Sequence, residues 1–282
     1  YAKIPLSRKT ELQLATRRSI TDLIVTPTYN QYFKRIFQDS DLTNTLDDSY
    51  SISQNEDFYF YDITAKFLYD ITDKDKIRIH FLNVNNALKY DEQSTMNDNN
   101  EALQSNLSQK NLATGITYTR DWNERLSTTG QVYLSKYDLN ATNFDVLNNQ
   151  RLIQENEVTD GSVKFDMNYK ATQTIKINGG YQFSEIGISN LEDVNNPVFR
   201  SYIKEVVRSH AIYTESSILS NNALTNLKIG ARINYHEKFS MFLFEPRLNF
   251  SQRFLNYFRL EIQGEIKSQT TSQIIDLQND FL

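Results

Sequence analysis

Residues 161–170 read GSVKFDMNYK, and in this stretch apolar and polar side chains alternate one by one. The odd positions hold Val163, Phe165, Met167 and Tyr169, whereas the even positions hold serine, lysine, aspartate and asparagine. Successive side chains of a β-strand point to opposite faces of a sheet, so strict alternation predicts a strand with one apolar and one polar face. The segments TIKINGGYQFS (174–184), LKIGARINYH (227–236) and FRLEIQGEIK (258–267) repeat the pattern.

The same alternation, weaker or shifted, extends over most of the chain. It recurs at 58–70, 76–90, 107–121, 125–139, 204–218 and 241–253, with leading pieces at 1–6 and 10–18. We therefore predict about twelve strands in a single partial domain over residues 1–282. The predicted fold class is all-β, an antiparallel meander in which strands run up and down in chain order.

The predicted connections are of two kinds. Short turns are expected at 7–9, 72–75, 122–124, 171–173, 220–222 and 255–256, and a further short one near 237–240. Long connections are expected at 19–56, 91–105, 140–156 and 188–203. Alternate connections of an antiparallel meander emerge at the same end. The sequence therefore predicts a sheet with long loops at one end and tight turns at the other.

Strand length and aromatic placement favour a membrane-spanning barrel over a soluble sandwich. The predicted strands have about 10–14 residues, against a usual length of about 5–6 in globular proteins, and this suits a tilted crossing of a bilayer. Aromatic residues, among them Tyr90, Trp122, Tyr235 and Phe242, fall near predicted strand ends. Amphipathic rings in membrane barrels gather at the headgroup level. We therefore expect an outer-membrane, multi-pass β-barrel segment in contact with lipid, its polar strand face lining the lumen.

Composition narrows the remaining possibilities. The chain of 282 residues has no cysteine, which excludes thiolate catalysis and a disulfide framework. The net charge of −5 gives no global attraction to nucleic acid. Nowhere do 18 consecutive apolar residues occur, so no transmembrane helix is predicted. The first residue, Tyr1, is not a natural start, and we expect a mature or internal fragment.

No constellation of residues predicts catalysis, a metal or a cofactor. The histidines His80, His210 and His236 lie on separate strands without a second ligand at metal spacing. Ser209 and His210 are adjacent on one strand and must point to opposite faces, so they cannot pair. The acidic runs at 55–59, 96–101 and 191–196 lack the spacing of a calcium loop. The dipeptide at 179–180, Gly-Gly inside a strand, is interpreted as a bend or bulge.

The segment TRRSITDLIVTPTYNQYFKRIFQD (16–39) departs from the alternation. Thr26 followed by Pro27 is typical of a helix start, and aromatic residues then recur at helical spacing. We predict a short helix at about 27–38 within a long outward loop, 19–56. Its aromatic face would pack at the barrel mouth. Tyr29, Tyr32, Arg35 and Asp39 are candidate ligand contacts, and a nucleic-acid role is disfavoured by the acidic chain as a whole.

The opening strand, the segment TRRSITDLIVTPTYNQYF (16–33) and the run FEPRLNFSQRF (244–254) together resemble the TonB-dependent outer-membrane receptors, in particular the plug-bearing type abundant in Bacteroidetes. The resemblance covers nearly the whole chain and corresponds to the middle of the barrel. It implies a 22-strand barrel filled by an N-terminal plug. It also implies a high-affinity ligand bound from outside and energy from the inner-membrane TonB complex. The plug, the TonB box and the last strands of that family have no counterpart within these residues.

The resemblance implies uptake of a scarce nutrient, which could be a ferric siderophore, haem, a vitamin or an oligosaccharide. The polar strand face would then hold the plug or guide the ligand. Its candidate residues are Asp62, Arg78, Lys164, Asp166, Lys176, Arg232, Arg247, Arg259 and Glu261. Two alternatives stay open: a passive porin without a plug, and a soluble β-sheet protein that binds carbohydrate. No enzymatic activity is predicted.

Overall fold

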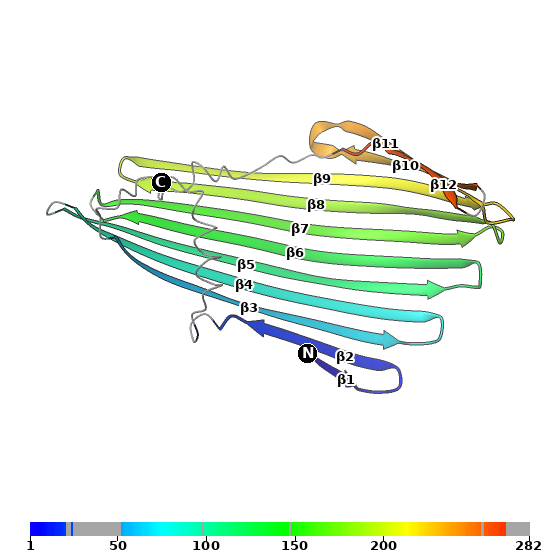
Figure 1. Ribbon diagram of the computed structural model, residues 1–282, viewed down its shortest axis with the longest axis horizontal. Helices are drawn as coiled ribbons and strands as arrows, with labels where there is room; N and C mark the ends of the chain where they lie inside the picture. The colour runs from blue at the N-terminus through cyan, green and yellow to red at the C-terminus, as the bar shows by residue number, and fades with distance from the viewer. Residues whose placement is uncertain (21–23, 25–51, 97–98, 147, 255–256, 269–282) are drawn as a thin grey trace.

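The alternating segments pair in chain order into one antiparallel sheet (Figure 1). The structure, a computed structural model, describes residues 1–20, 24, 52–96, 99–146, 148–254 and 257–268. Its strands are β1 (Ala2–Pro5), β2 (Thr10–Arg18), β3 (Ile52–Asp70), β4 (Asp75–Met96), β5 (Asn99–Asp121), β6 (Leu126–Asp145), β7 (Gln150–Lys170), β8 (Ile175–Asn195), β9 (Val198–Leu219), β10 (Thr225–His236), β11 (Met241–Phe254) and β12 (Phe258–Glu265). The predicted all-β, up-and-down arrangement of about twelve strands is confirmed.

Cross-strand register gives the sheet one apolar and one polar face. Residues directly opposite in neighbouring antiparallel strands share a face. Val132 of β6 lies opposite Ile116 of β5 and Val163 of β7, and Val163 lies opposite Phe183 of β8. The side chains of Ile116, Val132 and Val163 are 51%, 48% and 47% exposed. Nothing in the described residues covers this row, so the sheet presents its apolar face outward.

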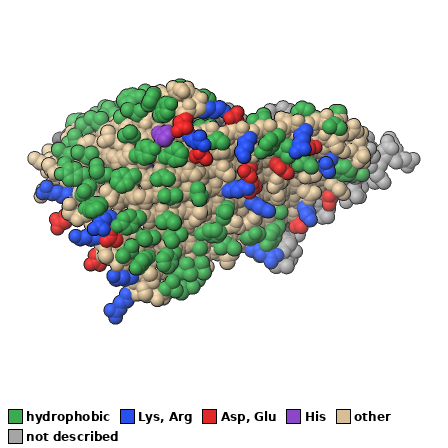
Figure 2. Space-filling view, turned by 180° about the vertical axis from the view of Figure 1, so that it is seen from behind, with side chains coloured by type: hydrophobic (Ala, Val, Ile, Leu, Met, Phe, Trp, Pro, Cys, Tyr) green, Lys and Arg blue, Asp and Glu red, His purple; other side chains and the backbone are tan. Residues whose placement is uncertain are grey.

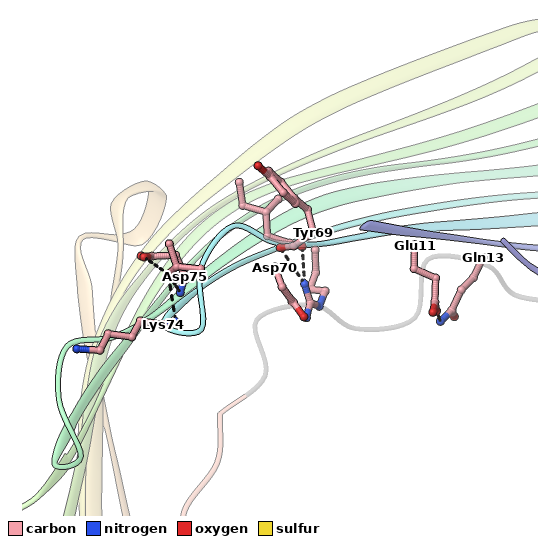
Figure 3. A network of polar contacts seen from close by, with 9 residues as sticks. Glu11, Gln13, Tyr69, Asp70, Lys74 and Asp75 are labelled. Atoms are coloured by element: carbon pink, nitrogen blue, oxygen red, sulfur yellow. Dashed lines mark hydrogen bonds and ion pairs between the residues drawn. The ribbon is translucent and has the colours of Figure 1, made fainter. Parts of the chain in front are cut away.

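The sheet is curved, and the apolar face is the convex one. In Figure 3, Tyr69 at the end of β3 points to the convex side, whereas its neighbour Asp70 points to the concave side. Glu11 and Gln13 of β2 also lie on the concave side. Hydrophobic side chains gather on the convex face over the half nearer the short turns (Figure 2). The polar strand positions therefore line the hollow of the sheet.

The two edges of the sheet are β1 and β12. The strand order runs from β1 to β12 without a pairing that joins these two strands. Among the described residues the sheet is therefore open. The part of the chain that the structure describes contains no helix long and apolar enough to cross a membrane.

Within the described residues, the tight turns form where the sequence predicts them. At the β3–β4 turn, the Thr72 hydroxyl accepts hydrogen bonds from the backbone N–H groups of Lys74 (3.1 Å) and Asp75 (3.0 Å) (Figure 3). Asn123 closes the β5–β6 turn, where its side-chain oxygen accepts from the N–H groups of Arg125 and Leu126. Short polar side chains of this kind stabilise turns by mimicking a backbone acceptor. The predicted short connection near 237–240 is the 3₁₀ turn η2 (Glu237–Phe239).

The opposite end of the sheet corrects the predicted loops. The sequence predicts long connections at 91–105, 140–156 and 188–203. In the structure most of these residues belong to strands β4 to β9. The strands from β3 to β9 have 19–23 residues each. Between β8 and β9 only Asn196 and Pro197 connect the strands. The prediction failed because the polar and apolar positions exchange faces along these strands. The two ends of the sheet do differ, but the end opposite the tight turns carries long β-hairpins where the sequence predicted loops.

Two smaller expectations are wrong. β8 runs through Gly179 and Gly180 with unbroken register to β7 and β9, so the glycines do not mark a bulge. Instead, a Cβ atom at Gly180 would overlap the Phe165 carbonyl oxygen and the Tyr213 ring. The glycine is needed because the Tyr213 ring lies against the backbone there. Tyr90 is not an outward interface residue, because it shares the concave face with Arg78 and is only 9% exposed.

Candidate functional site

The register places all nine candidate lumen residues on the concave face. Along β4 to β8 this face is traced by the row Arg78, Thr117, Gln131, Lys164 and Gln182, each opposite the next. The other candidates occupy positions of the same parity on their strands: Asp62, Asp166, Lys176, Arg232, Arg247, Arg259 and Glu261. The arrangement agrees with the predicted shared face. Its assignment to a lumen remains a prediction.

One charged cluster joins strands β7 to β10. The Lys164 ammonium lies 3.1 Å from the Asp166 carboxylate, and the Tyr213 hydroxyl donates to the same carboxylate. The Tyr213 ring is also approached by both cations, Lys164 at 5.7 Å and Arg232 at 5.5 Å from its centroid. A cation over an aromatic face is attracted by the negative ring quadrupole. The cluster therefore fixes the orientation of a tyrosine between two cations and one anion.

Amide side chains extend the cluster to neighbouring strands. The Arg232 guanidinium donates to Asn234 Oδ1 at 2.7 Å and to Gln182 Oε1 at 3.1 Å. Glu245 of β11 lies opposite Arg232 and accepts a hydrogen bond from the backbone N–H of Ser268 at 3.0 Å. Sequence reasoning gave no role to Tyr213. The signal was present, because an aromatic residue stands at a polar-phase position of β9 opposite a glycine of β8.

The other candidates form local contacts and not one site. Asp62 is 4% exposed and lies 2.6 Å from the Arg17 guanidinium of β2. Arg78 lies 2.5 Å from Asp70, and Arg259 lies 2.6 Å from Glu261 (Figure 3 shows the Asp70 pair). Such pairs at partly exposed positions contribute little to stability, because water and salt screen them. These residues share the concave face of the sheet, where they can form many ion pairs and hydrogen bonds.

A hollow of about 440 Å³ on the same side contains further charged groups. Its lining includes Glu215, Lys228 and Arg247, together with Asn249 and Gln263. Lys176 of β8 is not part of this lining, so the sequence candidates Lys176 and Arg247 are not brought together.

The convex face changes character along the strands. We call the end of the sheet with the tight turns the lower end and the opposite end the upper end. Above the apolar rows lies a charged belt formed by Lys136, Asp138, Glu157, Glu185 and Arg208. Lys136 of β6 lies 2.8 Å from Glu157 and 2.9 Å from Asp138, and Arg208 lies 2.6 Å from Glu185. The hydrogen bonds that the Lys136 ammonium donates to the carboxylates of Glu157 and Asp138 raise its pKa, since both favour its charged form. The charged belt therefore marks the upper limit of the apolar band.

An aromatic group surrounds His210 at this limit. The ring of His210 lies 5.1 Å from Phe183, and its Nδ1 atom lies 2.7 Å from the Tyr181 hydroxyl. Its Nε2 atom lies 2.8 Å from Glu237. Ser209 points to the other face, where its hydroxyl lies 2.7 Å from that of Ser184. The predicted separation of Ser209 from His210 is confirmed, and their arrangement is not that of a nucleophile with its base.

The lower limit of the apolar band carries the tryptophan. The indole N–H of Trp122 donates to Thr128 at 2.9 Å, and the Arg120 guanidinium lies 4.5 Å from the ring centroid. Within the described ranges, no three acidic, histidine or cysteine side chains are grouped so that they could hold a metal ion. The loop candidates Tyr29, Tyr32, Arg35 and Asp39, and the predicted helix at 27–38, lie outside the described residues.

Comparison with known proteins adds the following findings. No protein-family model matches the sequence, and no curated protein matches it. Among solved structures, the chain is similar to the ferric yersiniabactin uptake receptor FyuA from Yersinia pestis, with 11% identity and a TM-score of 0.45. The match covers 93% of this chain and 49% of that receptor.

Two further solved structures match the chain with similarly low sequence identity and TM-score. The ferric citrate transporter FecA in its unliganded form matches with 9% identity and a TM-score of 0.44 over 78% of this chain and 42% of that one. The translocator domain of the autotransporter NalP from Neisseria meningitidis matches with 10% identity and a TM-score of 0.36, over 84% of this chain and 90% of that one. The chain spans less than half the length of the two receptors. Likenesses of this size carry no conclusion about function.

Proposed function

We propose that this chain is part of an outer-membrane barrel of the TonB-dependent receptor type, which takes up a scarce nutrient. The observation that carries the proposal is the division of the two faces. Apolar side chains stand half-exposed on the convex face, while ion pairs and amides line the concave face. In water this arrangement would expose a broad apolar surface and hide the charges, which is the reverse of a soluble sheet. In lipid it is the expected arrangement.

The limits of the apolar band support the same proposal. Trp122 and Arg120 mark one limit, and the belt of Lys136, Glu185 and Arg208 marks the other. Tryptophan is favoured at the headgroup level of a bilayer, and charged groups are disfavoured between the two interfaces. The hairpins beyond the charged belt would project outside the cell. The candidate loop contacts Tyr29, Tyr32, Arg35 and Asp39 belong to this outward end in the proposal.

The concave face then has a partner inside the barrel. A wall with cations, anions and amides in contact with one another is suited to a polar domain that fills the lumen. The proposed partner is the plug of the same protein, which the TonB complex would move to release ligand. The candidates for plug or ligand contacts are the nine residues of the concave face described above.

The test is the location and the energy requirement of the protein in cells. We expect the full-length protein in the outer-membrane fraction, and ligand uptake that stops when the tonB gene is deleted or a protonophore is added. Recovery of folded protein from the aqueous phase without detergent would overturn the membrane assignment. Uptake that persists without TonB would indicate a passive porin.

A further inference from the structure

The upper half of the concave face is a wall of uncharged side chains, here called the neutral panel. It consists of a set of uncharged inward positions of β4 to β8 beyond the level of the charged belt. Its members are Val84, Asn86, Leu88, Tyr90, Ser105, Leu107, Gln109, Asn111, Tyr137, Leu139, Ala141, Asn143, Leu152, Gln154, Asn156, Val158, Ile188 and Asn190. Each row combines amides with apolar residues: Asn86, Gln109, Leu139, Asn156 and Asn190 lie opposite one another in turn.

Two amides of the panel, those of Asn143 and Asn190, have hydrogen-bonding capacity that the described residues leave unused. Asn143 is 8% exposed, and its Nδ2 atom makes no hydrogen bond. The Oδ1 atom of Asn190 is likewise buried without a partner in the described structure. The bond between Asn86 and Gln109 is long, at 3.4 Å. A buried polar group without a partner is costly. A donor and an acceptor kept in this state on one wall therefore indicate a ligand with hydroxyl or amide groups.

Charge decides which ligand suits the panel. Acidic residues border it on the concave face: Asp62 on β3, Asp145 on β6, Asp160 on β7, Glu192 on β8 and Glu205 on β9. Two cations lie beside them, Arg17 of β2 opposite Asp62 and Lys238 in an ion pair with Glu205. Asp62 is paired with Arg17, and Asp160 accepts a hydrogen bond from Ser162. The basic residues of the charged cluster, Lys164 and Arg232, lie in the lower half. An anionic ligand in the upper half would meet carboxylates and no cation of the panel.

We propose that the neutral panel binds an uncharged oligosaccharide. Sugar hydroxyls can both donate to and accept from carboxamides such as those of Asn143 and Gln109. The apolar faces of sugar rings can pack on Tyr137 and the leucines of the panel. The inference rests on the proposed uptake function and names the class of its substrate.

The experiment measures binding to the full-length protein in detergent micelles by calorimetry. The probes are neutral hexasaccharides of glucose, xylose, mannose and galactose, with ferric citrate as an anionic comparison. We expect at least one neutral hexasaccharide to bind. Raising the salt concentration from about 50 to about 500 mM should change its affinity less than about twofold, since no ion pair is formed. Asn143→Ala and Gln109→Ala should each weaken binding about tenfold.

The matched control is Asn140→Ala, on the same strand as Asn143 but on the convex face. It should leave binding unchanged. A purely structural role of Asn143 would lower the thermal midpoint of Asn143→Ala in parallel with affinity, whereas we expect that midpoint to be equal to the wild-type value or higher.

Three results would overturn the proposal: no neutral hexasaccharide binds, ferric citrate binds instead with strong salt dependence, or an uncharged peptide is preferred. None of them affects the proposed uptake function, which TonB deletion tests separately with whatever ligand is found.

Discussion

The lower and upper halves of the same strands carry opposite patterns. In the lower half of β6, Val132 and Leu134 are convex and half-exposed. Two residues further on, the same face holds Lys136, which forms two ion pairs. On the concave face of β7 the change runs the other way, from Lys164 in its ion pair with Asp166 to the uncharged Val158. The strand geometry is the same in both halves, so the difference reflects the surroundings of the sheet.

The comparison teaches where the proposed membrane ends. A hydrocarbon environment accepts only apolar side chains on the convex face, and the concave face is then free to hold charges. In this proposal the convex face beyond the bilayer meets water, which suits the charged side chains found there. The concave face of the upper half can therefore specialise for a neutral ligand.

The largest loss of stability is expected from placing a charge on the convex face of the lower half. Val132→Arg should reduce the free energy of unfolding in lipid vesicles by about 2–4 kcal/mol, because a guanidinium would enter hydrocarbon. The control is Asn140→Arg on the same face and strand, in the upper half, with an expected change within about 0.5 kcal/mol. Equal effects in urea titrations of the two variants would remove the distinction between the halves.

A second prediction concerns backbone packing in the two halves. Gly180→Ala should destabilise the lower half by about 2 kcal/mol, since the new methyl group would overlap the Phe165 carbonyl and the Tyr213 ring. Gly187→Ala in the upper half would place a Cβ 2.7 Å from the Thr159 hydroxyl, a side-chain atom that can rotate away. We expect less than about 1 kcal/mol there. The two urea midpoints, measured side by side, would contradict this account if Gly187→Ala were the more harmful change.

The third prediction compares two concave tyrosines. Tyr213→Phe removes a hydrogen bond to the Asp166 carboxylate and should cost about 1 kcal/mol. Tyr137 in the neutral panel lies opposite Asn111 and Val158, and no ionised group accepts from it in the described structure. Tyr137→Phe should therefore change the unfolding free energy by less than about 0.5 kcal/mol. A larger loss for Tyr137→Phe would indicate an unrecognised polar network in the upper half.

The smallest effect lies at the lower limit of the sheet. The Asp75 carboxylate accepts hydrogen bonds from Tyr118 (2.6 Å), Thr72 (2.7 Å) and Arg120 (3.0 Å), and the bond from Tyr118 does most to lower its pKa. A carboxyl group with a lowered native pKa stabilises the fold above its ordinary pKa. This contribution to stability is lost as the pH falls from the ordinary pKa of the carboxyl group through its lowered pKa in the native protein.

The wild-type thermal midpoint should consequently fall between about pH 5 and pH 3 more than that of Asp75→Asn. Asp73→Asn, in the same turn, is the control and should keep the wild-type pH dependence. Identical pH profiles for wild type and Asp75→Asn would show that these hydrogen bonds do not stabilise the turn.

Some of the concave wall could be predicted and some could not. Alternation assigned all nine charged candidates to one face, because strand parity alone decides this. It gave no role to Tyr213, because the ring is positioned by Gly180 of a neighbouring strand. It also missed the neutral panel, since residues such as Asn143 and Gln109 belong to segments that were interpreted as loops. Their pattern shifts where polar and apolar positions exchange faces, and a period-2 criterion with a fixed phase fails there.

The sequence by itself determined the class of this protein's fold: about twelve antiparallel strands, the tight turns of one end, and which charged residues share a face. These follow from local rules, since side-chain period, turn residues and strand order act over a few neighbouring positions. Only the tertiary structure decided which face is convex, how far the hairpins extend, and which side chains of distant segments meet. Curvature and cross-strand register depend on contacts between strands, as in the approach of Arg232 to Tyr213 and Gln182, and no single segment contains them.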